Sequence, residues 1–270
     1  MNIGMNIFYP VPVKKQVELF HRYGVKRTFW SSEKPEFEED MRLFRENGII
    51  CETLHAPYRG INSFWGEDEE AAQAMMLRLK DCIDKCARHE IPVAVVHLSE
   101  GRPMPAITER GVARFEELFA YAEEKGIRIA LENLKYLENL SYFMDRYKTP
   151  GFCWDCGHQY CCMQGIEVMD LFGDRLIALH IHDNRCGDDT DDHLIPFDGN
   201  IPFEQVARKI AESGYEGTLM LEIGKYSTID GIVAYADTED EEYVRRAAEG
   251  ARRIADMVED FKREICTRKA

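Results

Sequence analysis

The chain has 270 residues, of which 45% are hydrophobic and 31% charged, an ordinary composition for a globular protein in water. Its 34 Lys and Arg against 49 Asp and Glu give a formal net charge of −15, which repels polyanions at long range but leaves room for a local basic groove. No apolar run long enough to span a membrane occurs, and residues 1–15 lack the pattern of a secretory signal. We therefore expect a cytoplasmic protein whose nine cysteines are free thiols.

Short β-rich segments alternate with longer amphipathic segments along the chain. The predicted strands are residues 6–9, 27–30, 49–55, 93–99, 128–133, 151–155, 177–182 and 218–223. Between them, apolar residues recur at helical spacing over 72–86 and 112–122. The last helix is predicted to open with a capping box formed by Thr238 and Glu241 and to continue past residue 261.

Eight strand-like segments, each followed by a helical or connecting segment, predict a parallel sheet with crossover helices. Length alone allows two small domains, but 270 residues also lie close to the about 250 typical of an eight-fold barrel. The competing fold, an open doubly wound sheet, needs a glycine fingerprint in its first turn, and none follows Tyr9. We therefore predict an α/β protein with a single (β/α)8 TIM barrel domain over residues 1–270.

The later predicted strands end in side chains that can move protons or bind metal. These side chains, with those of one following loop, are His55, His97, Glu132, Asp155, His158, His180, His182, Asp191, His193 and Glu222. Because the strands of a parallel barrel all end on one face, we expect these groups to converge there. Burying several imidazoles and carboxylates together is costly unless something pairs them, and a divalent cation pairs both kinds well. The sequence therefore predicts a metal centre at the C-terminal mouth of the barrel.

Each of these residues also has a structural interpretation. A single strand histidine such as His97 is more often a hydrogen-bonded core residue than a ligand, and Glu132 or Glu222 alone could be an ion-pair partner. The metal interpretation is preferred because so many such groups at matching strand ends have no shared structural explanation. Lys135 and Lys225 could meet an anionic substrate group or lie on the surface.

The cysteines of the sixth strand region resemble half of a zinc site. Cys153 and Cys156 are followed by Cys161 and Cys162. However, strand residues three apart point to opposite faces, and a second Cys-x-x-Cys is missing. Buried free thiols are therefore the preferred interpretation.

Four segments resemble the xylose isomerase-like barrel superfamily, which includes AP endonuclease family 2. It contains sugar and sugar-phosphate isomerases, ketose 3-epimerases, related dehydratases and the endonuclease IV class of apurinic endonucleases. The segments are Leu131-Glu132-Asn133, Asp155-Cys156-Gly157-His158, His180-Ile181-His182-Asp183 and Asp198-Gly199-Asn200-Ile201. The resemblance runs from about His55 to Glu222 and implies a divalent metal, Zn or Mn, with Mg or Co as alternatives.

The resemblance implies one of two ligand sets. The isomerase and epimerase members hold one metal with four residues, which are here Glu132, Asp155, His180 and Glu222. The endonucleases hold three zinc ions with a wider set, here His55, His97, Glu132, Asp155, His158, His180, Asp191, His193 and Glu222. This chain matches both sets, so ligand identity alone does not separate the two classes.

The leading hypothesis is a metal-dependent isomerase or epimerase of a small sugar, cyclitol or sugar phosphate. The strongly acidic loop 184–192 and the net charge favour a carbohydrate substrate over nucleic acid, whose phosphates need basic contacts. Glu132 and Glu222 would move the proton through an enediolate, and His182, His158 or His193 would shuttle protons to substrate oxygens. The alternatives are a trinuclear zinc apurinic endonuclease, a dehydratase on the same scaffold and, least favoured, a non-catalytic binding barrel. No membrane partner is expected, and the resemblance allows a homo-oligomer.

Overall fold

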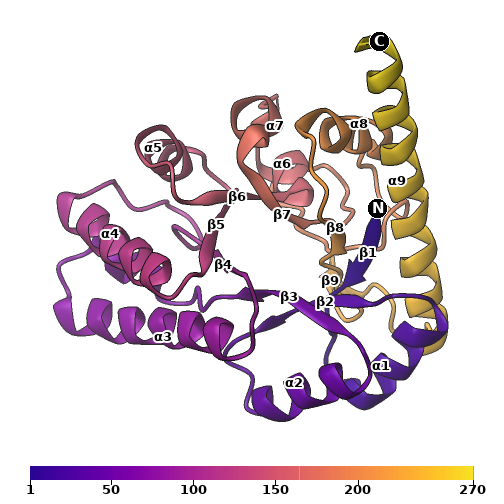
Figure 1. The fold of residues 1–270 in the computed structure, drawn as a ribbon, viewed down its shortest axis with the longest axis horizontal. Coiled ribbons are helices and arrows are strands. Elements are labelled where there is room, and N and C mark those ends of the chain that lie inside the picture. Colours follow the sequence, from indigo (N-terminus) through magenta and orange to yellow (C-terminus); the bar gives the residue numbers. More distant parts are fainter. Residues whose placement is uncertain (164, 270) are drawn as a thin grey trace.

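Eight parallel strands form a barrel with the helices outside it in the computed structural model, which describes residues 1–163 and 165–269 (Figure 1). The strands are β1 (Asn2–Met5), β2 (Arg27–Ser31), β3 (Ile50–His55), β4 (Val93–Val96), β5 (Arg128–Glu132), β6 (Gly151–Asp155), β7 (Leu176–His180) and β8 (Thr218–Leu221). Their order in the sheet is β7-β6-β5-β4-β3-β2-β1-β8. The ring closes just beyond β7, where Ile181 pairs with Leu221 in parallel fashion. The predicted single-domain (β/α)8 barrel is therefore confirmed.

The crossover segments are helical, as their apolar spacing predicts. The α-helices are α1 (Val13–Arg22), α2 (Phe37–Glu46), α3 (Glu69–Arg88), α4 (Glu109–Glu124), α5 (Glu138–Arg146), α6 (Cys156–Cys162), α7 (Val168–Phe172), α8 (Phe203–Ser213) and α9 (Asp240–Lys269). Single 3-10 turns (Ile61–Trp65 and Gly173–Arg175) and a small hairpin, β9 (Thr228–Ile229) and β10 (Ile232–Val233), complete the described elements. In α3 the residues that recur at helical spacing are the buried ones, because one stripe of an amphipathic helix faces the barrel. None of the described helices is both long and apolar enough to cross a membrane.

The first predicted strand was wrong, because β1 lies at Asn2–Met5 and not at residues 6–9. The sequence does not predict this strand, because it contains Gly4 and glycine is unfavourable inside strands. In the barrel the absence of its side chain is required, since a Cβ on Gly4 would lie 2.7 Å from the Met220 side chain. Residues 6–9 instead form the loop after β1, where the Asn6 amide exchanges two hydrogen bonds of 2.9 Å with the main chain of Ile223.

Two further boundaries differ from the prediction. Several strands end earlier than predicted, so that His97 directly follows β4 and Glu222 directly follows β8. The predicted capping box is also wrong, because α9 starts at Asp240, two residues after Thr238. The Thr238 N–H is already bonded to the carbonyl of Tyr235 in the preceding turn.

Candidate active site

The predicted acid–base and ligand residues converge on the C-terminal mouth of the barrel. His55, Glu132, Asp155 and His180 are the last residues of β3, β5, β6 and β7. His158 lies on α6, and the loop between β7 and α8 contributes Asp191 and His193. A cavity of about 210 Å³ opens at this mouth, and its walls include His55, His97, Glu132, His158, Asp191, His193 and Glu222.

Glu132 is the centre of this arrangement. Its Oε2 lies 3.2 Å from His97 Nε2, and its Oε1 lies 3.3 Å from His180 Nδ1. His180 Nδ1 is also 3.1 Å from Glu222 Oε2, so one ring nitrogen faces both carboxylates. Burial alone would raise the pKa of Glu132, but His180 and His97 hold it well below its usual range. The same balance between burial and His180 lowers the pKa of Glu222.

Asp191 organises a second group of side chains beside the first. Its Oδ2 lies 3.3 Å from His158 Nε2, and its Oδ1 lies 3.3 Å from His193 Nε2 and 3.6 Å from His182 Nε2. Burial works against protonation of His193, but the carboxylate of Asp191 outweighs it and raises the pKa of His193 to about 10. Without a cation, His193 therefore carries a proton that balances the carboxylate of Asp191.

Several buried polar atoms of the site have no hydrogen-bond partner among the described residues. They are Asp155 Oδ2, both ring nitrogens of His180, His182 Nε2 and Asp191 Oδ1. Leaving such atoms unpaired costs about 1–3 kcal/mol each, whereas a divalent cation would satisfy Asp155 and one ring nitrogen of His180 together. Donor atoms of Glu132, Asp155, His180 and Glu222 lie within 4.8 Å of one another, as do those of His55, His97 and Glu132 and those of His182, Asp191 and His193. Mixed imidazole and carboxylate donors suit Zn and Mn, so these residues fit a metal.

Main-chain carbonyls orient four of the site histidines. The contacts from Nδ1 are 2.9 Å from His55 to Ala56 O, 3.0 Å from His158 to Asn133 O, 3.3 Å from His182 to Asp183 O and 2.8 Å from His193 to Glu222 O. Because a carbonyl oxygen only accepts, Nδ1 donates in each case, and a neutral ring then keeps its free lone pair on Nε2. The second nitrogen is thereby directed into the site, as in metal-binding histidines generally.

Not every residue that the sequence singled out reaches the cavity. His182 is fully buried behind Asp155, with Nε2 3.2 Å from Asp155 Oδ1, and is not among the lining residues. Lys225 is buried in an ion pair with Asp240, so its ammonium is already engaged at the start of α9. Lys135 does line the cavity and forms an ion pair with Asp189.

The loop after β4 adds wall residues that the sequence did not single out. Ser99, Glu100 and Gly101 line the cavity, and the main chain of Glu100 is fixed by two hydrogen bonds to the Asn62 amide, of 2.8 and 3.0 Å. Their position directly after a barrel strand is the signal that could have found them.

Asp183 belongs to one of the four sequence segments that resemble the barrel superfamily. Its side chain fixes the loop that carries site residues and does not line the cavity itself. Its carboxylate accepts hydrogen bonds from the main-chain N–H groups of Asn184, Phe197, Gly199 and Ile201, at 2.8 to 3.0 Å. It thereby ties the segment 197–201 to the end of β7 and fixes the loop that carries Asp191 and His193.

Gly157 leaves the space that the His182 ring occupies. A Cβ at Gly157 would lie 1.9 Å from His182 Cε1, and the fully buried ring has no room to retreat. We expect Gly157→Ala to displace His182 and to destabilise the fold by about 1–3 kcal/mol through overpacking. Thermal denaturation together with calorimetric zinc titration would measure both effects. Gly66→Ala is the control, because a Cβ there has ordinary room; equal zinc binding by Gly157→Ala and wild type would contradict this expectation.

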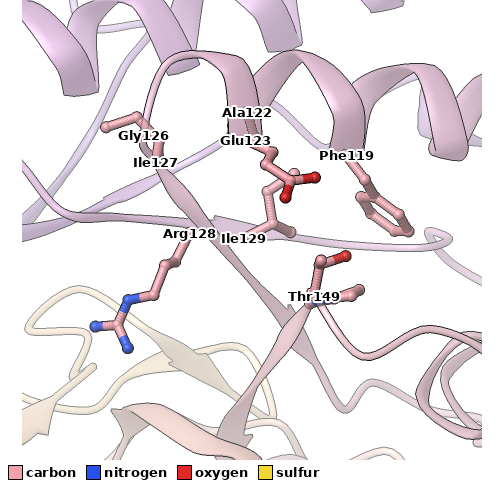
Figure 2. A pocket seen from close by; sticks show the side chains of 9 residues that line it. Phe119, Ala122, Glu123, Gly126, Ile127, Arg128, Ile129 and Thr149 are labelled. Atoms are coloured by element: carbon pink, nitrogen blue, oxygen red, sulfur yellow. The ribbon is translucent and has the colours of Figure 1, made fainter.

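A second cavity of about 290 Å³ lies at the opposite end of the barrel, beside the starts of β5 and β6 (Figure 2). Its walls are Phe119, Ala122, Glu123, Gly126, Ile127, Arg128, Ile129, Thr149 and Pro150. They supply one carboxylate and one guanidinium without any imidazole. Barrel enzymes carry their chemistry at the C-terminal face, so the mouth around Glu132 is the candidate active site.

The chain is similar to several known proteins. It is 26% identical over 294 residues to the uncharacterised protein y4fM of Sinorhizobium fredii, covering 93% of this chain and 91% of that protein. It is 27% identical over 221 residues to the fructoselysine 3-epimerase of Shigella flexneri, covering 77% and 75%.

Solved structures share the fold. A structure of L-ribulose 3-epimerase superposes with a TM-score of 0.80 at 15% identity, covering 100% of this chain and 99% of the other. The D-psicose 3-epimerase of Clostridium cellulolyticum H10 with D-tagatose gives a TM-score of 0.75 at 16% identity, covering 95% and 99%. The model of the xylose isomerase-like TIM barrel family matches residues 15–254. Because that match spans most of a chain whose strands form the same barrel, the protein belongs to the xylose isomerase-like TIM barrel family.

Proposed function

We propose that this protein is an isomerase or epimerase of a small sugar, cyclitol or sugar phosphate. The observation that carries the proposal is the placement of Glu132 and Glu222 on the walls of one small cavity, both in contact with His180 Nδ1. Two carboxylates held at one cavity can remove a proton from a carbon and return it. The similarity to a fructoselysine 3-epimerase and to the folds of ketose 3-epimerases supports this choice.

Glu132, Asp155, His180 and Glu222 would hold a divalent cation, since their donor atoms form one group within 4.8 Å. When bound, the cation stabilises the negative charge that develops on the substrate oxygens as the carbon loses its proton. The Asn133 side chain supports this group, because it exchanges two hydrogen bonds of 2.8 Å with the main chain of Asp155. Asn133 thus ties the end of β5 to the end of β6.

In this proposal the glutamates transfer the proton at the substrate carbon, and the histidines transfer protons at the substrate oxygens. One of Glu132 and Glu222 takes the proton from the carbon beside the carbonyl, and the other, protonated at that moment, returns one. His158 and His193 lie on the cavity wall and would pass protons to substrate oxygens. His182 lies behind Asp155 and does not reach the cavity. It would influence proton transfer only through Asp191, whose Oδ1 lies 3.6 Å from His182 Nε2.

Deuterium exchange tests this function across many candidate sugars at once. The purified protein, loaded with Mn or Zn, is incubated in D2O with a panel of ketoses, their phosphates and keto-cyclitols. We expect deuterium to appear at the carbon beside the carbonyl of at least one substrate, together with an epimer or isomer. Loss of water instead of reprotonation would identify a dehydratase. Absence of exchange with the whole panel would contradict the proposal.

A trinuclear zinc phosphodiesterase is the second candidate, and a specific observation favours it. Besides the group around His180, donor atoms gather in two further groups, His55 with His97 and Glu132, and His182 with Asp191 and His193. Against it, the cations near the cavity are already paired with carboxylates: Lys135, which lines the cavity, pairs with Asp189, and Arg102 pairs with Asp188. These cations are therefore not free to contact the phosphates of a nucleic acid.

Metal analysis and an incision assay separate the two candidates. We expect one tightly held ion per chain and no cleavage of a duplex with an abasic site. Three zinc ions per chain together with incision would replace the isomerase proposal by the nuclease.

A further inference from the structure

His180 is held differently from the four site histidines that donate Nδ1–H to a carbonyl. Its Nδ1 faces the carboxylates of Glu132 and Glu222, so the proton of a neutral, metal-binding ring must sit on Nε2. Neither ring nitrogen has a hydrogen bond of normal geometry with a described residue, although the side chain is 1% exposed. One face of the ring stacks on Phe29, with ring centroids 4.8 Å apart. Stacking fixes the plane of the ring but not its rotation within that plane, so the edge of His180 needs a further partner.

Cys153 is placed to be that partner. This residue lies on β6 two positions before Asp155, so both side chains point to the same side of the strand. Its Sγ, a carboxylate oxygen of Glu132 and a ring nitrogen of His180 all lie within 4.8 Å of one another. The thiol is fully buried.

Apart from His180 and Glu132, the neighbours of Cys153 that pack around it in the barrel interior are apolar. Cys153 belongs to a small interior cluster whose other members are Val93, Val95, Ala130 and Ala178. None of those side chains can donate or accept a hydrogen bond. In the register of the sheet, Cys153 pairs with Ala178 while Asp155 pairs with His180, which places the thiol one layer below the proposed metal ligands.

We propose that Cys153 is a positioning residue, whose sulfur is the hydrogen-bond partner that holds the His180 ring with Nδ1 toward Glu132 and Glu222. The inference rests on the proposed metal centre and adds the outer partner of one ligand. Outer partners of metal-binding histidines fix the ring and its tautomer, and their loss typically costs about 10–100-fold in metal affinity. A thiol is a weak partner compared with a carbonyl, which makes His180 the ligand whose orientation depends most on a single side chain.

Manganese titration of the metal-free protein by calorimetry tests the proposal, because it reads binding and not turnover. We expect Cys153→Ala to bind Mn²⁺ about 10–100-fold more weakly than wild type. Cys153→Ser, which keeps a hydrogen-bonding atom at the same place, is expected to recover most of that loss. Cys86→Ala is the matched control, because Cys86 is an equally buried thiol on α3; it should leave the affinity unchanged.

Thermal denaturation of the metal-free variants separates positioning from packing. Cys153→Ala and Cys86→Ala each lose one buried thiol. The proposal is supported if both lose similar stability but only Cys153→Ala binds Mn²⁺ more weakly. Wild-type affinity in Cys153→Ala would overturn it, and so would equal weakening in the alanine and serine variants or a wild type that binds no Mn²⁺. A wild type whose Mn²⁺ affinity depends on Cys153 as expected, but which exchanges no substrate deuterium, would refute the proposed function alone.

Discussion

Replacement of Glu132 by glutamine is expected to lower turnover by at least about 10³-fold, the scale of a lost acid–base group, while the barrel stays folded. Glu132 contributes donor atoms to every group that contains His180 or His97, so no other side chain can take over its position. An amide is nearly the same size as the carboxylate, but it neither takes a proton from carbon nor neutralises a cation. The variant should therefore lose both metal binding and deuterium exchange.

The fold is expected to survive this change because the neighbouring imidazoles can adjust their charge. Stranding a buried charge costs about 3–5 kcal/mol, but His180, whose pKa lies above its usual range partly because of Glu132, can release its proton once the carboxylate is gone. Asp40→Asn is the matched control, because Asp40 is equally buried and accepts a hydrogen bond of 3.0 Å from Trp30, and neither residue lines the cavity at the mouth. Circular dichroism would compare the folds, and the exchange assay the activities. Full exchange activity in Glu132→Gln would exclude Glu132 from catalysis.

The convergence of the site could be predicted from the sequence because it follows from topology alone. His55, Glu132, Asp155 and His180 end strands that are far apart in the chain, and a parallel barrel brings all strand ends to one face. Knowing which residues end strands was therefore enough to predict which would meet. The same reasoning explains why an error at β1, which carries none of the proposed ligands, did not disturb the site.

The orientation of each side chain could not be predicted in this way. Whether Nδ1 or Nε2 of a histidine faces the site depends on which carbonyl lies beside it, and for His180 no carbonyl does. His182 follows His180 by two residues and carries the same sequence signal, yet it lies behind Asp155 because Gly157 leaves room for its ring there. Such packing depends on the contact between α6 and the segment that follows β7, which spacing within one strand does not report.

The role of Cys153 illustrates the same limit. In the sequence it is one of nine cysteines, for which a buried free thiol is the preferred interpretation. The structure confirms a buried, unpaired cysteine but also places it under His180. This proximity follows from the pairing of β6 with β7. It gives a buried thiol a positioning role in the proposed metal centre.

Removal of the metal is the second change from which we expect a large effect, namely complete and reversible loss of activity with a marked loss of heat stability. A ligand present at about 1,000 times its Kd stabilises the folded state by about 4 kcal/mol. For a chain of this size that corresponds to a fall in Tm of about 10 °C on removal. Dialysis against a chelator followed by scanning calorimetry, with and without added Mn or Zn, would measure it. An unchanged Tm and full activity after chelation would refute the metal centre.

The pH dependence of this effect follows from the state of the metal-free site. Burial works against the protonation of His193 and His180, but the carboxylate of Asp191 raises the pKa of His193 to about 10. The contact with Cys153 and the carboxylates of Glu222 and Glu132 raise the pKa of His180 above its usual range. At neutral pH a cation must therefore displace protons in order to bind. As the pH rises toward 10 this competition weakens, so the affinity and the metal-dependent gain in Tm should both increase between pH 6 and pH 9. Binding heats that differ between buffers of unequal ionisation enthalpy would register the released protons, whereas a pH-independent affinity would show that the imidazoles are already neutral before the cation arrives.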